Sequence, residues 1–298
     1  LGIAWRNAAR MFSIPPAIGE TTLLLTGCLW LFLLSRYVHQ VLTSSNGALR
    51  ELLLQLQNPF LTLIPITTGL ASVALHPYAS LPAHILLFIG VAGQLLFSSY
   101  HISGQWHGNT PSEMETPAMY MPTVGANFAS AIALGAFGYS HWGYVFFGAG
   151  FLSWMSLEAT YLYHLRSSKP LHPEQRPLLG IQLAPAFVGS SAYLSCNGGQ
   201  IDMVVLGLIG YGLLNLFFMV RLMTWVLRLG LSMSLWAFSF AMASMVNVGF
   251  RLSCAALDDS FTLLGHLFVM LGTTVIALLI GETLLLVITS RKKKSRIA

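Results

Sequence analysis

Charged residues are scarce in this sequence. Asp, Glu, Lys and Arg make up 8% of its 298 residues, whereas they make up about a quarter of an ordinary soluble domain. Hydrophobic residues make up 55%, so a water-soluble globular protein is excluded and the chain is an integral membrane protein. Because a spanning helix takes about 20 residues, the chain has room for about ten spans but for no sizeable domain outside the membrane. We therefore expect residues 1–298 to form a single transmembrane domain.

The motifs of soluble enzymes and of metal sites are missing. The three cysteines, Cys28, Cys196 and Cys254, form no CxxC pair, which speaks against a disulfide framework or a zinc site. The nine histidines are scattered without a HExxH spacing, and neither GxGxxG nor GxxxxGKS/T occurs. An intramembrane enzyme would need paired catalytic residues at matching depth, and we find none. We expect no cofactor, no metal and no enzymatic activity.

Apolar segments of spanning length recur along the chain. The sequence starts in an apolar stub that ends near Phe12, which we interpret as the end of a first helix whose beginning is absent. Runs such as Val204–Ile209 are apolar on every face, unlike the alternating strands of a membrane barrel. The sequence therefore predicts an all-α membrane protein with ten transmembrane helices. The nine that follow the stub are expected at residues 18–43, 57–76, 81–103, 122–139, 142–166, 178–196, 202–228, 232–255 and 260–290.

The positive charges are unevenly divided between the two ends of these helices. Ten helices place both termini on one side, together with the basic tail Arg291–Arg296. Of the fifteen Lys and Arg residues, only Arg6, Arg10 and Arg251 lie toward the other side. Because cytoplasmic loops collect Lys and Arg, we expect a multi-pass protein of the bacterial inner membrane with both termini in the cytoplasm. The tail is then a juxtamembrane anchor and not a nucleic-acid contact.

The predicted helices are of two alternating kinds. We number the predicted helices in chain order, with the stub as helix 1. Helices 3, 5, 7 and 9 are rich in small and hydroxyl residues, whereas helices 2, 4, 8 and 10 are dominated by Leu, Ile, Val and Phe. Small residues mark packing faces in any helix bundle, but three of the odd helices also carry an interior proline: Pro65, Pro122 and Pro185. Proline kinks a helix and is tolerated where it is buried in protein or lies beside a water-filled cavity. We therefore expect the odd helices inside and the even helices facing lipid.

Five motifs resemble those of the TehA tellurite-resistance/dicarboxylate transporter family, to which the plant guard-cell slow anion channels are distantly related. In chain order they are Pro65–Thr68, Tyr120–Phe128, Leu183–Phe187, Phe218–Leu222 and Trp236–Phe240. They extend over nearly the whole chain, and their order makes the resemblance specific. The resemblance implies a homotrimer in which each subunit arranges ten transmembrane helices as five helical hairpins. An inner ring of odd helices then surrounds a pore, and an outer ring of even helices encloses it.

The resemblance also implies a gate. A phenylalanine of helix 9 closes the pore in this family, and its motif position matches Phe240. Without the resemblance, an ordinary packed aromatic is the simpler interpretation of Phe240. Phe238 is the alternative position for the same role.

The odd helices after the first contain none of the ten acidic residues. A pore without carboxylates has no ring that attracts cations, so we expect small inorganic anions or dicarboxylates as partners, besides membrane lipid. Hydroxyl groups suited to replace part of an anion's water shell are those of Thr67, Thr68, Ser130, Ser190, Ser191 and Ser239. The predicted pore-shaping residues are Pro65, Pro122 and Pro185, and the predicted pore-lining residues are Thr67, Thr68, Gly69, Gly125, Phe128, Ser190, Phe238 and Ser239.

Four charges lie within the even helices: Arg36, Glu158, Arg221 and Glu282. Counted from the cytoplasmic helix ends, all four lie roughly 9 to 12 Å below the same surface. Charges in lipid are costly unless they are paired or reach the interface. We predict intramembrane ion pairs between Glu158 and Arg221 and between Glu282 and Arg36, with independent snorkelling of the arginines and protonation of the acids as the alternative.

Two functions are compatible with these features. The first is a gated anion channel or channel-like exporter of the resembled family, in which anions follow their electrochemical gradient. The second is a proton-coupled carrier for C4-dicarboxylates or sulfite, which needs a titratable group in the pathway, and Glu158 is the one candidate. The position of Glu158 on an even helix favours the channel.

Overall fold

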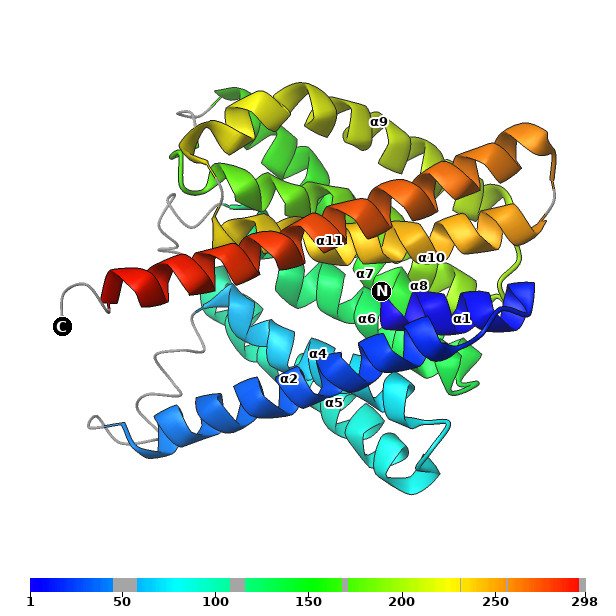
Figure 1. Cartoon of the computed structure of the whole chain (residues 1–298), viewed down its shortest axis with the longest axis horizontal. Coiled ribbons are helices and arrows are strands. Elements are labelled where there is room, and N and C mark those ends of the chain that lie inside the picture. The colour runs from blue at the N-terminus through cyan, green and yellow to red at the C-terminus, as the bar shows by residue number, and fades with distance from the viewer. Residues whose placement is uncertain (45–57, 108–115, 168–170, 231, 256, 295–298) are drawn as a thin grey trace.

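The computed structural model of the chain describes residues 1–44, 58–107, 116–167, 171–230, 232–255 and 257–294 (Figure 1). These residues form ten α-helices and no strand, so the all-α prediction is confirmed. Six helical stretches are long and apolar enough to cross a membrane, and the chain is a multi-pass membrane protein. The helices are α1 (Gly2–Phe12), α2 (Ala17–Leu42), α4 (Leu63–Leu75), α5 (Ser80–Trp106), α6 (Ala126–Ala136), α7 (Ser140–Ser167), α8 (Ala184–Cys196), α9 (Met203–Val226), α10 (Ser239–Ala255) and α11 (Asp259–Lys294).

Four helices begin with turns that are not α-helical. Short 3-10 segments lead directly into α4, α8 and α10, and a π-helical segment leads into α6. Pro65 and Pro185 lie in the first turn of α4 and of α8, and Pro122 lies in the π-helical segment. Proline has no N–H to donate, so it is tolerated where the α-helical hydrogen bonds begin. The prolines therefore mark helix starts, and not kinks in helix middles as the sequence suggested. The segments are η1 (Pro59–Thr62), η4 (Met121–Gly125), η5 (Arg176–Leu183) and η7 (Met233–Phe238).

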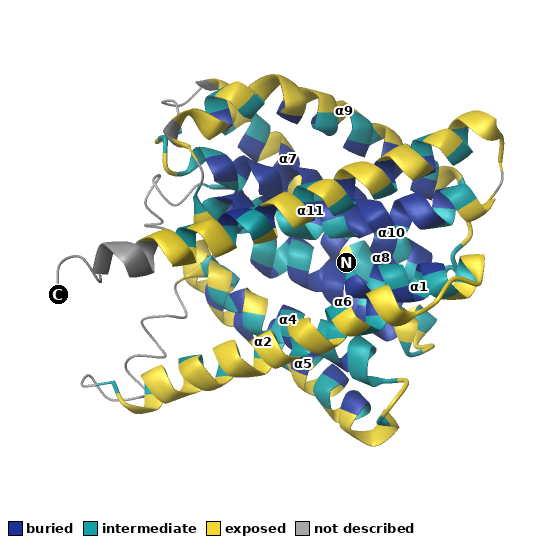
Figure 2. Cartoon of the chain, viewed as in Figure 1, coloured by how far each residue is buried: buried dark blue, intermediate teal, exposed yellow. Residues whose placement is uncertain are grey.

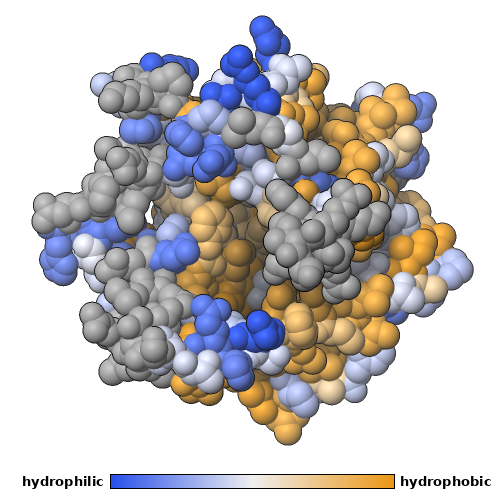
Figure 3. Space-filling model, turned by 60° about the vertical axis from the view of Figure 1, so that its left-hand side comes forward, coloured by the Kyte–Doolittle hydropathy of each residue, from blue (hydrophilic) through white to orange (hydrophobic). Residues whose placement is uncertain are grey.

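Burial alternates along the chain. In the most apolar window of Arg176–Cys196, which contains α8, 78% of the residues are buried, and in Met233–Ala255, which contains α10, 56% are buried. The same share is 6% in α2 and 28% in both α5 and α11. Figure 2 shows the buried residues gathered around α6, α8 and α10, while Figure 3 shows hydrophobic residues over much of the flank. An exposed apolar flank of this kind is what a helix in lipid presents.

Close helix packing depends on glycine at two points. A Cβ on Gly265 of α11 would lie 2.6 Å from the carbonyl oxygen of Gly249 on α10. A Cβ on Gly90 of α5 would lie 2.8 Å from the backbone nitrogen of Gly69 on α4. Small residues thus let these helix backbones approach each other closely. The predicted pore-lining residue Gly69 is part of such a contact with α5.

Candidate functional site

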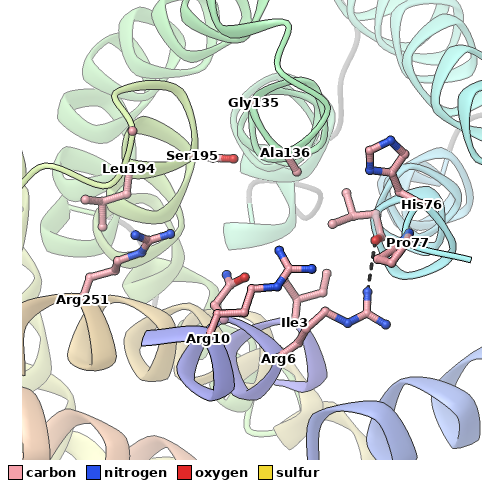
Figure 4. Close-up of a pocket in the computed structure, with 13 residues that line it drawn as sticks. Ile3, Arg6, Arg10, His76, Pro77, Gly135, Ala136, Leu194, Ser195 and Arg251 are labelled. Carbon is pink, nitrogen blue, oxygen red and sulfur yellow. Dashed lines mark hydrogen bonds between the residues drawn. The ribbon is translucent and has the colours of Figure 1, made fainter. Parts of the chain in front are cut away.

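Two adjoining cavities lie among α1, α4, α6, α8 and α10. One lies toward the ends of α4, α6, α8 and α10 (Figure 4), and the other reaches Phe240 near the start of α10. The larger one, here called the arginine cavity, has a volume of about 300 Å³. The smaller one, here called the Phe240 cavity, has a volume of about 180 Å³. Asn7, Ser195 and Arg251 are among the residues that line both. Neither lining contains Asp or Glu.

Helix α1 forms one wall because it packs on α10. Ala4 and Ala8 of α1 form a small apolar cluster with Val246 and Phe250 of α10. Their short side chains allow the two helices to approach closely. This packing presents the polar face of α1 to the cavities, with Arg6 and Arg10 among the residues that line the arginine cavity.

Arg6 is neutralised within the structure. Its guanidinium donates to both carboxylate oxygens of Glu20, with N···O distances of 2.6 Å. A remaining N–H group donates to the carbonyls of Val73 and Ala74. The hydroxyl of Tyr78 donates to the same Glu20 carboxylate at 2.6 Å. A bidentate pair with this many hydrogen bonds leaves little net field from Arg6.

Arg10 and Arg251 are not neutralised. Within the described residues, the one ion pair recorded is that of Arg6 with Glu20, and neither Arg10 nor Arg251 makes a hydrogen bond. Figure 4 shows Arg10 reaching into the arginine cavity from α1 and Arg251 from α10. The guanidinium of Arg251 lies against Gly199, whose φ of +82° and missing Cβ leave the space that the arginine fills. The cavity lining therefore includes two guanidinium groups without an ion-pair or hydrogen-bond partner among the described residues, the exposed Arg10 and the partly buried Arg251.

The Phe240 cavity receives residues from α1, α4, α6, α8 and α10. Its apolar wall includes Leu70 and Ile132. Its polar wall is a chain of hydrogen bonds in which Asn7 donates to Asn247 at 3.2 Å, and Asn247 donates to Ser191 at 3.3 Å. The amide side chains carry both donor and acceptor atoms, so it is the charge of Arg251, together with a lining that contains no Asp or Glu, that favours an anion over a cation.

The two candidate gate residues have different surroundings. Phe240 is partly exposed and lines the cavity, and it also packs on an apolar cluster formed by Ile66, Ala126 and Ala129. Phe238 is 5% exposed and packs directly over Gly180, where a Cβ would collide with its ring. Phe240 is therefore the aromatic that separates the cavity from the packed interior, whereas Phe238 belongs to the core.

Of the other predicted pathway residues, all but Ser191 lie outside these two cavities. Thr67, Thr68, Ser190 and Ser239 each donate a hydroxyl hydrogen bond to a carbonyl of the preceding helical turn. Phe128 is fully buried against Gly150 and Gly189. Gly69, Gly125, Ser130 and the three prolines are also absent from both linings, whereas Ser191 lines the Phe240 cavity.

The sequence signal for the missed residues was present. Arg6, Arg10 and Arg251 are the three positive charges that lie on the non-cytoplasmic side in the topology predicted from the sequence. The structure brings all three to one cavity. Charges that oppose the general bias of a membrane protein are therefore candidates for a site. Asn7 and Asn247 carried no comparable signal.

Glu158 has partners other than the predicted Arg221. Arg221 is exposed on α9, while Glu158 is 7% exposed. The carboxylate accepts hydrogen bonds from four neutral side chains, and these fill the acceptor positions that an arginine would need. The donors are Tyr120 at 2.7 Å, Trp154 at 2.9 Å, Gln182 at 2.7 and 2.8 Å, and Tyr211.

The second predicted ion pair is not formed in the structure either. Glu282 is 8% exposed, and its Oε1 atom has no hydrogen-bond partner. Arg36 is exposed on α2. The two side chains belong to α11 and α2, whose exposed apolar faces leave Arg36 free to extend along the helix toward the interface.

Comparison with known proteins identifies relatives. The SLAC1 family, described as "Voltage-dependent anion channel", matches residues 1–284. The tellurite resistance protein TehA homolog of Haemophilus influenzae is 40% identical over 248 residues, which are 83% of this chain and 75% of that protein.

Proposed function

Because this chain belongs to the SLAC1/TehA family of voltage-dependent anion channels, we propose that it is a gated anion channel. It conducts small inorganic anions or dicarboxylates passively, and Phe240 is its gate. The observation that carries this proposal is the position of Phe240 in the wall of a cavity that shares Arg251 with the adjoining arginine cavity, while neither lining contains Asp or Glu. An aromatic ring in a narrow apolar constriction both blocks and dewets it.

The cavities supply the electrostatics of an anion pathway. Uncompensated arginines at a mouth raise the local concentration of anions and repel cations. Beyond Phe240 the proposed pathway continues toward the starts of α4, α6 and α8, where Pro65, Pro122 and Pro185 lie. The non-α turns at these starts leave backbone groups outside the regular helical pattern, and these groups can face an anion.

The proposed architecture is a single transmembrane domain of five helical hairpins. The buried helices form an inner ring around the pathway, and the exposed apolar helices form an outer ring in lipid. The packing of α4 on α5, α6 on α7 and α10 on α11 supports the hairpins. In the bacterial inner membrane the arginine cavity opens to the periplasm, both termini are cytoplasmic, and three copies assemble as a trimer.

Single-channel recording in planar bilayers tests the gate. Phe240→Ala is expected to raise chloride conductance at least about tenfold, with Phe240→Leu intermediate, because conductance follows the space left by the side chain. Phe238→Leu is the matched control, since Phe238 packs in the core, and it is expected to leave conductance unchanged. A folded Phe240→Ala variant that conducts no better than the parent overturns the gate assignment.

The same recordings separate a channel from a proton-coupled C4-dicarboxylate or sulfite carrier. A carrier cycle produces no single-channel steps, and its flux follows the pH gradient. A channel produces steps, and its current reverses at the equilibrium potential of the permeant anion. The enclosure of Glu158 by four neutral donors, outside both cavities, supports the channel.

A further inference from the structure

The arginine cavity contains two kinds of guanidinium group. Arg6 is paired with Glu20, whose carboxylate neutralises the charge of the guanidinium. Arg10 and Arg251 come from different helices, line the same cavity and have neither an ion-pair nor a hydrogen-bond partner among the described residues. A guanidinium that no protein group occupies keeps its N–H donors and its charge available to an anion.

We propose that Arg10 and Arg251 form a binding site for doubly charged oxyanions, and that an oxyanion held there slows the passage of singly charged anions. The binding step stands on the cavity alone, whereas its effect on flux rests on the proposed channel function.

The charge of the site selects a dianion. Coulomb attraction to two guanidinium groups doubles when the charge of the ligand doubles. Each guanidinium also presents paired N–H groups whose geometry matches two oxygens of one oxyanion. Chloride has a single charge and no pair of oxygens, so it gains less on both counts. Sulfate is therefore the simplest probe of the site.

The arrangement also explains why a dianion stays at the mouth. Arg251 lines both cavities, but Arg10 lines only the arginine cavity. A dianion that moves on toward Phe240 keeps one arginine and loses the other. It also enters a smaller space, of about 180 Å³, whose wall includes the apolar Leu70 and Ile132. A singly charged anion loses half as much Coulomb energy on the same step.

Thermal unfolding in detergent tests binding without reference to conduction. Millimolar sodium sulfate is compared with sodium chloride at the same ionic strength, because a ligand that binds the folded state raises the unfolding temperature. We expect sulfate to raise it in the parent protein and not in Arg10→Gln with Arg251→Gln. The matched control is Arg6→Gln with Glu20→Gln, which removes two charges of opposite sign and is expected to keep the sulfate effect. Equal loss in both double variants overturns the site.

Chloride currents through Phe240→Ala test the effect on flux. Sulfate added on the side of the arginine cavity is expected to reduce the current, and Arg251→Gln is expected to raise the half-blocking concentration about tenfold. Arg251→Lys keeps the charge and is expected to retain most of the block. A chloride current that sulfate does not reduce overturns the proposal while leaving the channel intact. Absence of any chloride current contradicts the channel instead, and the unfolding experiment then decides the binding site alone.

Discussion

The arginine cavity and the Glu158 cluster lie at opposite ends of the buried helices and treat charge in opposite ways. At the ends of α1 and α10, Arg10 and Arg251 are left without partners beside open space. Near the starts of α6 and α8, Glu158 is enclosed by neutral donors. A charge that is fully hydrogen-bonded holds elements together, whereas a charge without a partner is available to a ligand. Pairing, and not burial alone, therefore distinguishes Glu158 and Arg6 from the two arginines for which we propose anion binding.

Glu158→Leu is expected to have the largest effect on stability, because it leaves buried donors of Tyr120, Gln182 and Tyr211 without an acceptor. The expected loss is about 3 to 5 kcal/mol in the free energy of unfolding, read from thermal or denaturant unfolding in detergent. Adding Tyr211→Phe to this variant removes one orphaned donor and is expected to restore part of the loss. If Glu158→Leu is as stable as the parent, the hydrogen bonds of Glu158 do not stabilise the packing of these helices.

Arg6→Gln is expected to cost less, about 2 kcal/mol, since the pair it breaks with Glu20 is partly exposed. Removing both partners with Arg6→Gln and Glu20→Gln is expected to cost less than removing Arg6 alone, because Glu20 is then not left as a carboxylate without its ion-pair partner. A double-mutant cycle read by unfolding measures this coupling. Strictly additive losses contradict the view that Arg6 is a structural charge.

Gly199→Ala is expected to cost about 1 to 2 kcal/mol, because alanine is strained at a φ of +82° and its Cβ would displace the guanidinium of Arg251. The displaced arginine is expected to weaken the block by sulfate as well. Gly198→Ala is the control for backbone strain, since Gly198 has a similar φ of +73° and also lines the arginine cavity, but its Cβ would lie more than 4 Å from Arg251. A sulfate response that both variants change equally points to backbone strain and not to Arg251.

Arg251→Gln is expected to have the smallest effect on stability, less than about 0.5 kcal/mol, because no partner loses a contact. The main effect of this variant is expected on sulfate binding and on the block of chloride current by sulfate. A large loss of stability in this variant, measured beside Arg6→Gln under the same conditions, contradicts the view that Arg6 stabilises the fold and Arg251 does not.

The sequence predicts the helices of this protein better than its cavities. Alternation of small-residue and Leu-rich spans follows directly from what lies against each helix, so the buried α6, α8 and α10 were expected inside. Hydroxyl groups did not predict the cavity-lining residues well, because the hydroxyls of Thr67 and Ser190 donate hydrogen bonds to backbone carbonyls of the preceding turn. The arginine cavity was missed because Arg10 and Arg251 meet only through the packing of α1 on α10.

The identity of the partners of Glu158 was equally hidden. A sequence shows that a buried acid needs compensation, and an arginine at matching depth is the obvious choice. Three of the donors that the structure provides, Tyr120, Gln182 and Tyr211, come from other elements. Neutral donors of this kind occur throughout the chain, so nothing in the sequence marks these three.

The 3-10 segment η7 ends at Phe238, two residues before Phe240, the proposed gate. The winding of η7 therefore sets the direction in which the Phe240 side chain points. A 3-10 helix turns about 120° per residue with a rise of about 2.0 Å, whereas an α-helix turns about 100° with a rise of 1.5 Å. Rewinding the 6 residues of η7 into α-helix would turn Phe240 by about 120° relative to the start of the segment and draw it back by about 3 Å. If Phe240 is the gate, as we propose, a change in helical pitch alone would reorient its ring with no change of side-chain rotamer.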